Sequence, residues 1–162
     1  MTQGALQPGD TSGVAGDEAR TLLEVMTDTA RELVAELGAS GCGISRAIGD
    51  VLVLVAEHTE DGRTLQLGQG YLIPDFPETQ AVMTLRVPRS ASLLDPDVDP
   101  SEAAVLREVG YSALLMLPLE VDGESWGLVE IYADGERQFG ADDVAAAEPI
   151  LERLREALGR LG

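Results

Sequence analysis

Two apolar runs in the second half of the chain, joined by a short turn, constrain the fold more than any other feature. The runs cover residues 112–121 and 125–133, and Asp122-Gly123 separates them. Asp-Gly between two strand-length apolar runs indicates a β-hairpin, because these residues tolerate the backbone angles of a tight turn. The sequence therefore predicts that the sheet is antiparallel at this point.

Long amphipathic helices are expected before and after the strands. Structure is expected to start near Asp17, and apolar residues recur at spacings of three and four over residues 19–37, before Gly38. The same spacing returns over residues 144–161, in a helix expected from about residue 141. Pro149 lies inside this second helix and is expected to kink or break it, because proline clashes with the carbonyl group one turn earlier.

Shorter elements are predicted between the first helix and the hairpin. Residues 51–58 are rich in β-branched side chains, and Asp61-Gly62 follows them, which predicts a strand that leads into a hairpin turn. Asp99-Pro100 with Glu102 has the pattern of a capped helix start. Strands are predicted at residues 42–46, 51–58 and 69–73, and short helices at 77–85 and 100–109.

The order of these elements predicts an α+β fold rather than a doubly wound α/β fold, because strands and helices do not alternate. With 162 residues, of which 44% are apolar, the chain suits one core of ordinary size. Residues 1–16 are rich in Gly, Thr, Gln, Ser and Pro, so we expect a disordered lead-in there. Residues 17–162 are expected to form a single domain.

The strong negative charge of the chain limits the kinds of partner that it is expected to bind. There are 29 acidic residues and 11 basic ones, which gives a formal net charge of -18. Such a surface repels phosphate backbones and anionic lipids, so neither nucleic acid nor a membrane is an expected partner. A single cysteine allows no disulfide within the chain, and no segment resembles an export signal or a membrane span. A cytoplasmic location is expected.

Three stretches of the sequence resemble a GAF domain. The run from Leu106 to Tyr132 is similar to the second half of that family, where a glycine-ended helix leads into a "PL…DG…G" hairpin. The stretch Phe139–Val144 is similar to the start of the family's last helix, and Tyr71–Pro77 also fits. The resemblance covers residues 17–161.

The resemblance implies a fold and a class of function. The fold of the family is a central antiparallel sheet with the first and last helices on one face and a ligand pocket under short helices on the other. Family members sense cyclic nucleotides, bilins, haem or other small molecules, and regulate an attached or partner output domain. Terminal helices of this kind commonly form a dimer bundle, so a homodimer is expected. The alternative is that both helices simply cover their own sheet.

The final strand supplies the candidate ligand-binding residues. Side chains alternate between the two faces of a strand, so Trp126, Glu130 and Tyr132 are expected to share one face. Aromatic rings with a carboxylate suit a mostly apolar pocket that orients a small ligand. The other reading is that Glu130 lies at an exposed edge and that the rings are ordinary core. Further neighbours expected at the pocket are Cys42, Tyr71, Phe76, Tyr111 and Met116.

No catalytic or metal-binding constellation is evident, so the chain is not expected to be an enzyme. Stand-alone family members that reduce free methionine sulfoxide use several cysteines, whereas this chain has only Cys42. That enzyme and a ligand-free dimerisation or scaffold module are the alternative functions. The sole histidine, His58, does not match a bilin or haem site, and Asp95–Asp99 fails as a calcium loop because Pro100 replaces the turn glycine. The cofactor and the ligand stay open.

Overall fold

The computed structural model describes residues 20–161, so the predicted lead-in at residues 1–16 lies outside them. Six antiparallel strands form one sheet in the order β3-β2-β1-β6-β5-β4. The α+β class and the antiparallel hairpin are confirmed. The strands are β1 (Gly41–Ile48), β2 (Val51–Thr59), β3 (Gly70–Leu72), β4 (Arg89–Ser92), β5 (Ala113–Val121) and β6 (Glu124–Ala133).

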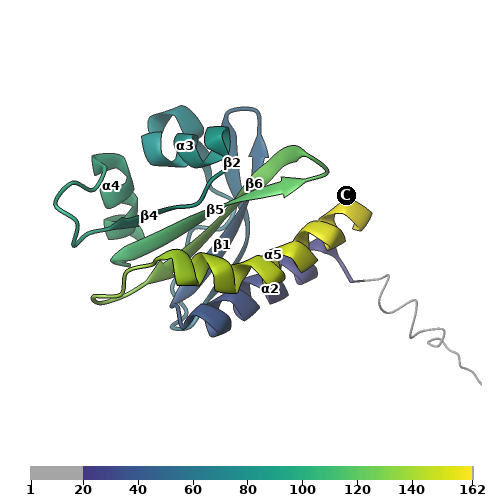
Figure 1. Cartoon of the computed structure of the whole chain (residues 1–162), viewed down its shortest axis with the longest axis horizontal. Helices are drawn as coiled ribbons and strands as arrows, with labels where there is room; N and C mark the ends of the chain where they lie inside the picture. Colours follow the sequence, from purple (N-terminus) through teal and green to yellow (C-terminus); the bar gives the residue numbers. More distant parts are fainter. Residues whose placement is uncertain (1–19, 162) are drawn as a thin grey trace, which may run out of the picture.

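The helices divide between the two faces of the sheet (Figure 1). The two long helices, α2 (Leu22–Leu37) and α5 (Ala141–Leu161), pack side by side on one face. The short helices α3 (Pro77–Leu85) and α4 (Pro100–Val109) cover the other face, together with the single 3-10 turn η1 (Ile73–Asp75). This is the arrangement that the family resemblance predicted.

Helix α2 has well-formed ends. It begins after Thr21, whose hydroxyl accepts a hydrogen bond from the backbone of Glu24 at 3.1 Å, while the Glu24 carboxylate accepts one from the backbone of Thr21 at 2.8 Å. This reciprocal capping box fixes the start of α2 at Leu22. The start of structure expected near Asp17 lies outside the described residues. Gly38 ends the helix in the left-handed conformation, with φ 61°, as expected.

Helix α5 continues through Pro149, so the predicted break is wrong. Pro149 lies on the solvent side of the helix, and so does Ala145, whose carbonyl group loses its helical partner. Water can therefore satisfy that carbonyl. Ala147 and Ile150, which flank the proline, are buried against the rest of the fold and hold both halves of the helix in place.

Two turns and one strand differ from the sequence-based expectation. The tight turn after β1 is Gly49-Asp50, whereas the chain at Asp61-Gly62 enters a loop that ends at β3, so the hairpin turn predicted there is wrong. Strand β4 was not predicted. Its sequence, Arg-Ser-Ala-Ser, has no apolar alternation, and only its pairing with β5 at the sheet edge makes it a strand.

The sheet separates two apolar layers. Leu33 of α2 and Leu154 of α5 are buried in the layer between the sheet and the long helices. Leu106 of α4 and Tyr132 of β6 are buried in the layer under the short helices. Alternate residues of the central strands β1 and β6 therefore contribute to opposite layers.

A β-bulge interrupts this alternation at Trp126. In the pairing of β5 with β6, Leu119 lies opposite Gly127 and Glu120 lies opposite Ser125, so Trp126 is the extra residue. Its side chain packs against the layer of the long helices instead of the layer under the short ones.

Replacing Gly127 with alanine is expected to destabilise the fold by roughly 1–3 kcal/mol. A Cβ atom at this position would lie 1.9 Å from the backbone oxygen of Ser45 in the neighbouring strand, which cannot move without disturbing the sheet. Urea denaturation measures the change. Gly159→Ala is the control, because a Cβ atom there would meet nothing closer than 3.7 Å. This change replaces a glycine inside a helix, so the free energy of unfolding should rise by up to about 1 kcal/mol. Equal losses in both variants would contradict this assignment.

Candidate functional site

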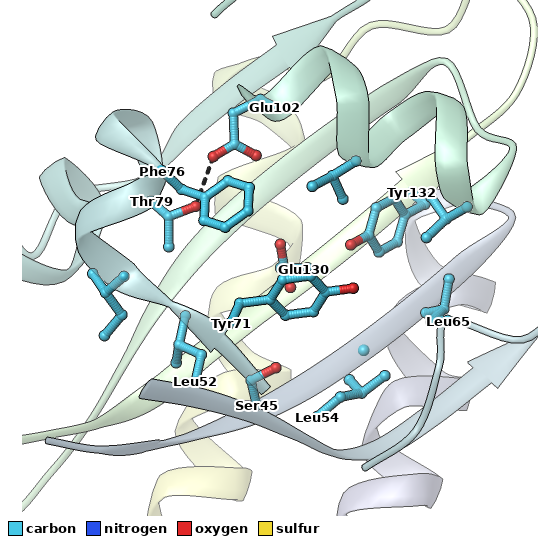
Figure 2. A pocket seen from close by; sticks show the side chains of 14 residues that line it. Ser45, Leu52, Leu54, Leu65, Tyr71, Phe76, Thr79, Glu102, Glu130 and Tyr132 are labelled. Atoms are coloured by element: carbon cyan, nitrogen blue, oxygen red, sulfur yellow. Dashed lines mark hydrogen bonds between the residues drawn. The ribbon is translucent and has the colours of Figure 1, made fainter. Parts of the chain in front are cut away.

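A small cavity lies between the sheet and the short helices (Figure 2). The centre of a water-sized sphere can occupy about 40 Å³ of it. This is room for a few water molecules or a small organic group, since one water needs about 10–15 Å³ by the same measure. The cavity is lined by Gly43, Ser45, Leu52, Leu54, Leu65, Tyr71, Ile73, Phe76, Thr79, Glu102, Val105, Val109, Glu130 and Tyr132.

Aromatic rings form part of the cavity wall. Tyr71 and Phe76 meet edge to face, with ring centroids 5.7 Å apart and an interplanar angle of 82°. Tyr132 stacks on Tyr111 with centroids 5.5 Å apart. These contacts hold the rings in fixed orientations around the cavity.

Glu102 contributes a buried carboxylate from the first turn of α4. Only 1% of this residue is exposed, and the hydroxyl of Thr79 on α3 donates a hydrogen bond of 2.7 Å to its Oε2 atom (Figure 2). Burial raises the pKa of Glu102, and the bond from Thr79 offsets part of that rise. Glu102 is therefore an acidic neighbour for the other carboxyl of the cavity, that of Glu130.

Glu130 contributes that second carboxyl from the middle of β6, between Gly43 of β1 and Met116 of β5. The space it faces is the cavity (Figure 2). Burial, and then the charge of Glu102, raise the pKa of Glu130 from 4.5 to about 8, and the hydroxyl of Tyr132 offsets part of the rise. The Glu130 carboxyl is therefore mostly protonated at neutral pH.

Neither cavity carboxyl has a cationic partner. Within residues 20–161, Glu102 and Glu130 take part in no ion pair, and none of the side chains that line the cavity is basic. Buried carboxyls usually have a partner, because an unpaired charge away from water is costly. No positive charge within residues 20–161 therefore compensates for ionisation of either cavity carboxyl.

The structure brings six of the eight predicted residues to this side of the sheet. Glu130, Tyr132, Tyr71 and Phe76 line the cavity. The other two, Tyr111 and Met116, lie one layer behind it: Tyr111 stacks on Tyr132, and the Thr79 hydroxyl lies 3.5 Å from the sulfur of Met116.

Trp126 and Cys42 do not line the cavity, so the prediction is wrong for both. The bulge in β6 moves Trp126 to the opposite layer, where the guanidinium carbon of Arg46 lies 4.6 Å from its ring centroid. Cys42 is fully buried beneath the long helices, because it alternates with the cavity residue Gly43 along β1. Burial, and to a lesser extent the charge of Glu130, raise the pKa of the Cys42 thiol far above its ordinary value.

Sequence reasoning missed Glu102 and Thr79. Glu102 was assigned only to the cap of its helix, yet it precedes Val105 and Leu106 by three and four residues and therefore shares their buried face. That spacing was the available signal for Glu102. Thr79 lies in the short helix α3, and nothing local in the sequence indicates that its hydroxyl faces a carboxylate on another helix.

His58 lies outside the cavity, at the end of β2. A ring nitrogen of His58 is 2.8 Å from the carboxylate of Glu60, and neither residue lines the site. Over the described part of the chain, no three His, Cys, Asp or Glu side chains are grouped closely enough to hold a metal ion. None of the helices described is both long and apolar enough to cross a membrane.

Known structures share this architecture. The phycocyanobilin-bound GAF domain of a cyanobacterial phytochrome is 21% identical, with a TM-score of 0.76 over 91% of this chain and 90% of that one. The blue-light absorbing form of the Thermosynechococcus elongatus PixJ GAF domain is 19% identical, with a TM-score of 0.72 over 86% of each chain. The chromophore-binding domain of an R. palustris bacteriophytochrome is 17% identical, with a TM-score of 0.74 over 90% of this chain and 58% of that one.

At these identities the solved structures establish a shared fold. The comparison with curated protein sequences gave no match. The family model described as "GAF domain" matches residues 21–158, which is nearly the whole of the chain described here. The arrangement of helices about the sheet, the cavity under α3 and α4, and this match lead to one conclusion: the chain belongs to the GAF domain family.

Proposed function

We propose that this domain is a regulatory sensor that binds a small molecule in the cavity under α3 and α4. The observation that carries the proposal is the cavity itself, whose wall joins aliphatic and aromatic side chains to two carboxyls without cationic partners. A wall that is mostly apolar, with a few convergent polar groups, is typical of small-molecule sites. The phycocyanobilin-bound GAF domain that shares this fold supports a small-molecule-binding role for the domain.

A route from the cavity to the long helices runs through the central strands. Gly43 and Glu130 face the cavity, while their neighbours Cys42 and Ile131 lie in the layer under α2 and α5. Because β1 and β6 are paired directly, a ligand that shifts these strands would also shift the surface on which the long helices pack. We propose that this movement is passed to an output domain or partner.

The two alternative functions have less support. A methionine sulfoxide reductase would need an accessible thiolate, whereas Cys42 is fully buried on the far side of the sheet from the cavity and its pKa is raised. A pure scaffold would need no cavity with unpaired carboxyls. A non-catalytic role in the cytoplasm remains our proposal.

The Val105→Phe variant tests the proposed site. Val105 lines the cavity from α4, so a phenylalanine there should fill the space and exclude a ligand. We expect a thermal-shift screen of cationic, neutral and anionic compounds to find at least one that raises the Tm of the wild-type domain by several degrees and leaves the variant unchanged. Compounds that stabilise both proteins equally would place binding elsewhere and favour the scaffold reading.

We further propose that the domain forms a homodimer through α2 and α5. Leu23 is 51% exposed near the start of α2, and Leu161 is 47% exposed at the end of α5. The two helices run antiparallel, so these leucines lie at the same end of the pair (Figure 1). Light scattering should give twice the chain mass for the wild-type protein and a single chain mass for the Leu23→Glu/Leu161→Glu double variant. A wild-type monomer at high concentration would overturn the dimer.

A further inference from the structure

We propose that the ligand is a small organic cation, with an ammonium or amidinium group on a short apolar body. This inference rests on the proposed sensory function and specifies the ligand class of the same cavity. It stands on three features of the wall: two carboxyls, the absence of a basic side chain, and aromatic rings around the space.

The charge of the wall favours a cation over other ligands. An anion would face Glu102 and Glu130 and find no arginine among the lining residues. No arginine among residues 20–161 lines the cavity, and the arginines on neighbouring segments have other partners. Arg89 of β4, which pairs with Met116, directs its guanidinium at Glu78 on α3, with its Nη1 atom 2.9 Å from the carboxylate Oε1. Arg46 lies over Trp126, and Arg63 lies over Tyr111 with its charge directed at Asp61 and Asp134. A bound cation supplies the positive partner that neither cavity carboxyl has among residues 20–161.

The aromatic side chains add a second, independent reason. Tyr71, Phe76 and Tyr132 approach the cavity from three elements, β3, the residue after η1, and β6. Tyr132 is only 4% exposed, and its ring is held by stacking on Tyr111. The face of an aromatic ring attracts an alkylammonium group, because the ring quadrupole is negative there, and the ring also packs against the carbon atoms of such a ligand.

The size of the space restricts the ligand. With about 40 Å³ open to the centre of a water-sized sphere, the cavity suits a body of a few carbon atoms. We therefore choose n-propylammonium as the probe. Propionate and 1-propanol have nearly the same shape and carry a negative charge and no charge, so they separate charge recognition from the filling of apolar space.

Binding is expected to be coupled to the loss of a proton. The groups that face Glu130 are Glu102 on α4, Tyr132 on its own strand and Tyr71 on β3. The tyrosine pKa values are raised, so both hydroxyls stay neutral between pH 6 and 9, whereas the pKa of Glu130, about 8, lies within that range. A cation favours ionised Glu130, whose proton then goes to solvent. Affinity should therefore rise with pH, by up to tenfold per unit below a pKa of about 8.

Calorimetric titration at pH 6 and pH 9 tests the proposal. We expect n-propylammonium to bind the wild-type domain up to about 100-fold more tightly at pH 9 than at pH 6, and propionate and 1-propanol to bind at least tenfold more weakly at pH 9. Glu130→Gln should lose about tenfold or more in affinity at pH 9 and most of the pH dependence. Glu124→Gln is the matched control, because it removes an exposed carboxylate from the same strand and should bind as the wild type does.

The outcomes separate this inference from the function on which it rests. Equal or tighter binding of propionate or 1-propanol, or unchanged affinity in Glu130→Gln, would overturn the cation and leave a sensor for another ligand class. No binding of n-propylammonium at either pH would also overturn it. The proposed function fails separately, when no compound of any charge distinguishes the wild type from Val105→Phe in the thermal-shift screen.

Discussion

At pH 9 the Glu130→Gln variant is expected to be several kcal/mol more stable than the wild-type domain, by up to about 5 kcal/mol, while at pH 5 the two should agree within about 1 kcal/mol. The side chain of Glu130 is half-buried at the cavity and has no cationic partner among residues 20–161. Glutamine has nearly the same shape and never ionises. Removing the charge should therefore help the fold wherever the glutamate is charged.

The direction follows from the raised pKa of Glu130. The unfolded chain ionises this group near 4.5, whereas the folded domain does so near 8. Its contribution to stability is therefore fully present below pH 4.5 and is lost as the pH rises to about 8. Over this window each pH unit lowers the free energy of unfolding by about 1.4 kcal/mol, which sets the upper limit of about 5 kcal/mol.

Urea denaturation of both proteins at several pH values measures this difference. The many other acidic residues change the absolute stability with pH, but they are common to both proteins and cancel in the comparison. Glu124→Gln carries the same change of charge at an exposed position and should stay within about 0.5 kcal/mol of the wild type throughout. Parallel pH profiles for the wild type and Glu130→Gln would contradict the raised pKa of Glu130 and its lack of a cationic partner.

The Leu33→Ala variant is expected to lose about 2–5 kcal/mol of stability. Leu33 is completely buried where α2 packs on the sheet, so its removal leaves a cavity in the layer beneath the long helices. The loss matters for function as well as folding, because this layer lies between the central strands and the helices that we propose carry the signal.

Leu23→Ala in the same helix is the control for this prediction. Leu23 is 51% exposed, so its truncation should change the stability of a single domain by less than about 1 kcal/mol. Thermal and urea unfolding of both variants give the comparison. A loss at Leu33 no larger than the loss at Leu23 would show that α2 does not pack as described.

Local signals in the sequence were sufficient for most of the fold. The Asp122-Gly123 turn, the cap at Asp99 and the glycine at position 38 each act within a few residues, so the hairpin and the helix ends could be placed from the sequence. Strand β4 could not, because its polar sequence becomes a strand only through pairing with β5, which is distant in the chain.

The candidate site was predicted in part, and the errors have physical causes. Alternation along β6 placed Glu130 and Tyr132 correctly on one face, but it failed at Trp126, where a bulge adds one residue and reverses the direction of the side chain. A bulge depends on the register with the neighbouring strand, which no local pattern reveals. The pairing of Glu102 with Thr79 depends in the same way on how two helices meet.

The most direct test of the central claim is a ¹H–¹⁵N NMR titration of the wild-type domain with n-propylammonium at pH 9. If n-propylammonium binds in the cavity, the largest chemical-shift changes occur at the backbone amides of Gly43, Thr79 and Glu130. These changes should disappear in Val105→Phe. A second place where a cation could bind is an open surface groove next to α5, lined by Glu120, Asp122, Glu152, Arg155, Glu156, Gly159 and Arg160. Shifts that gather at that groove, or that persist in Val105→Phe, would contradict binding in the cavity.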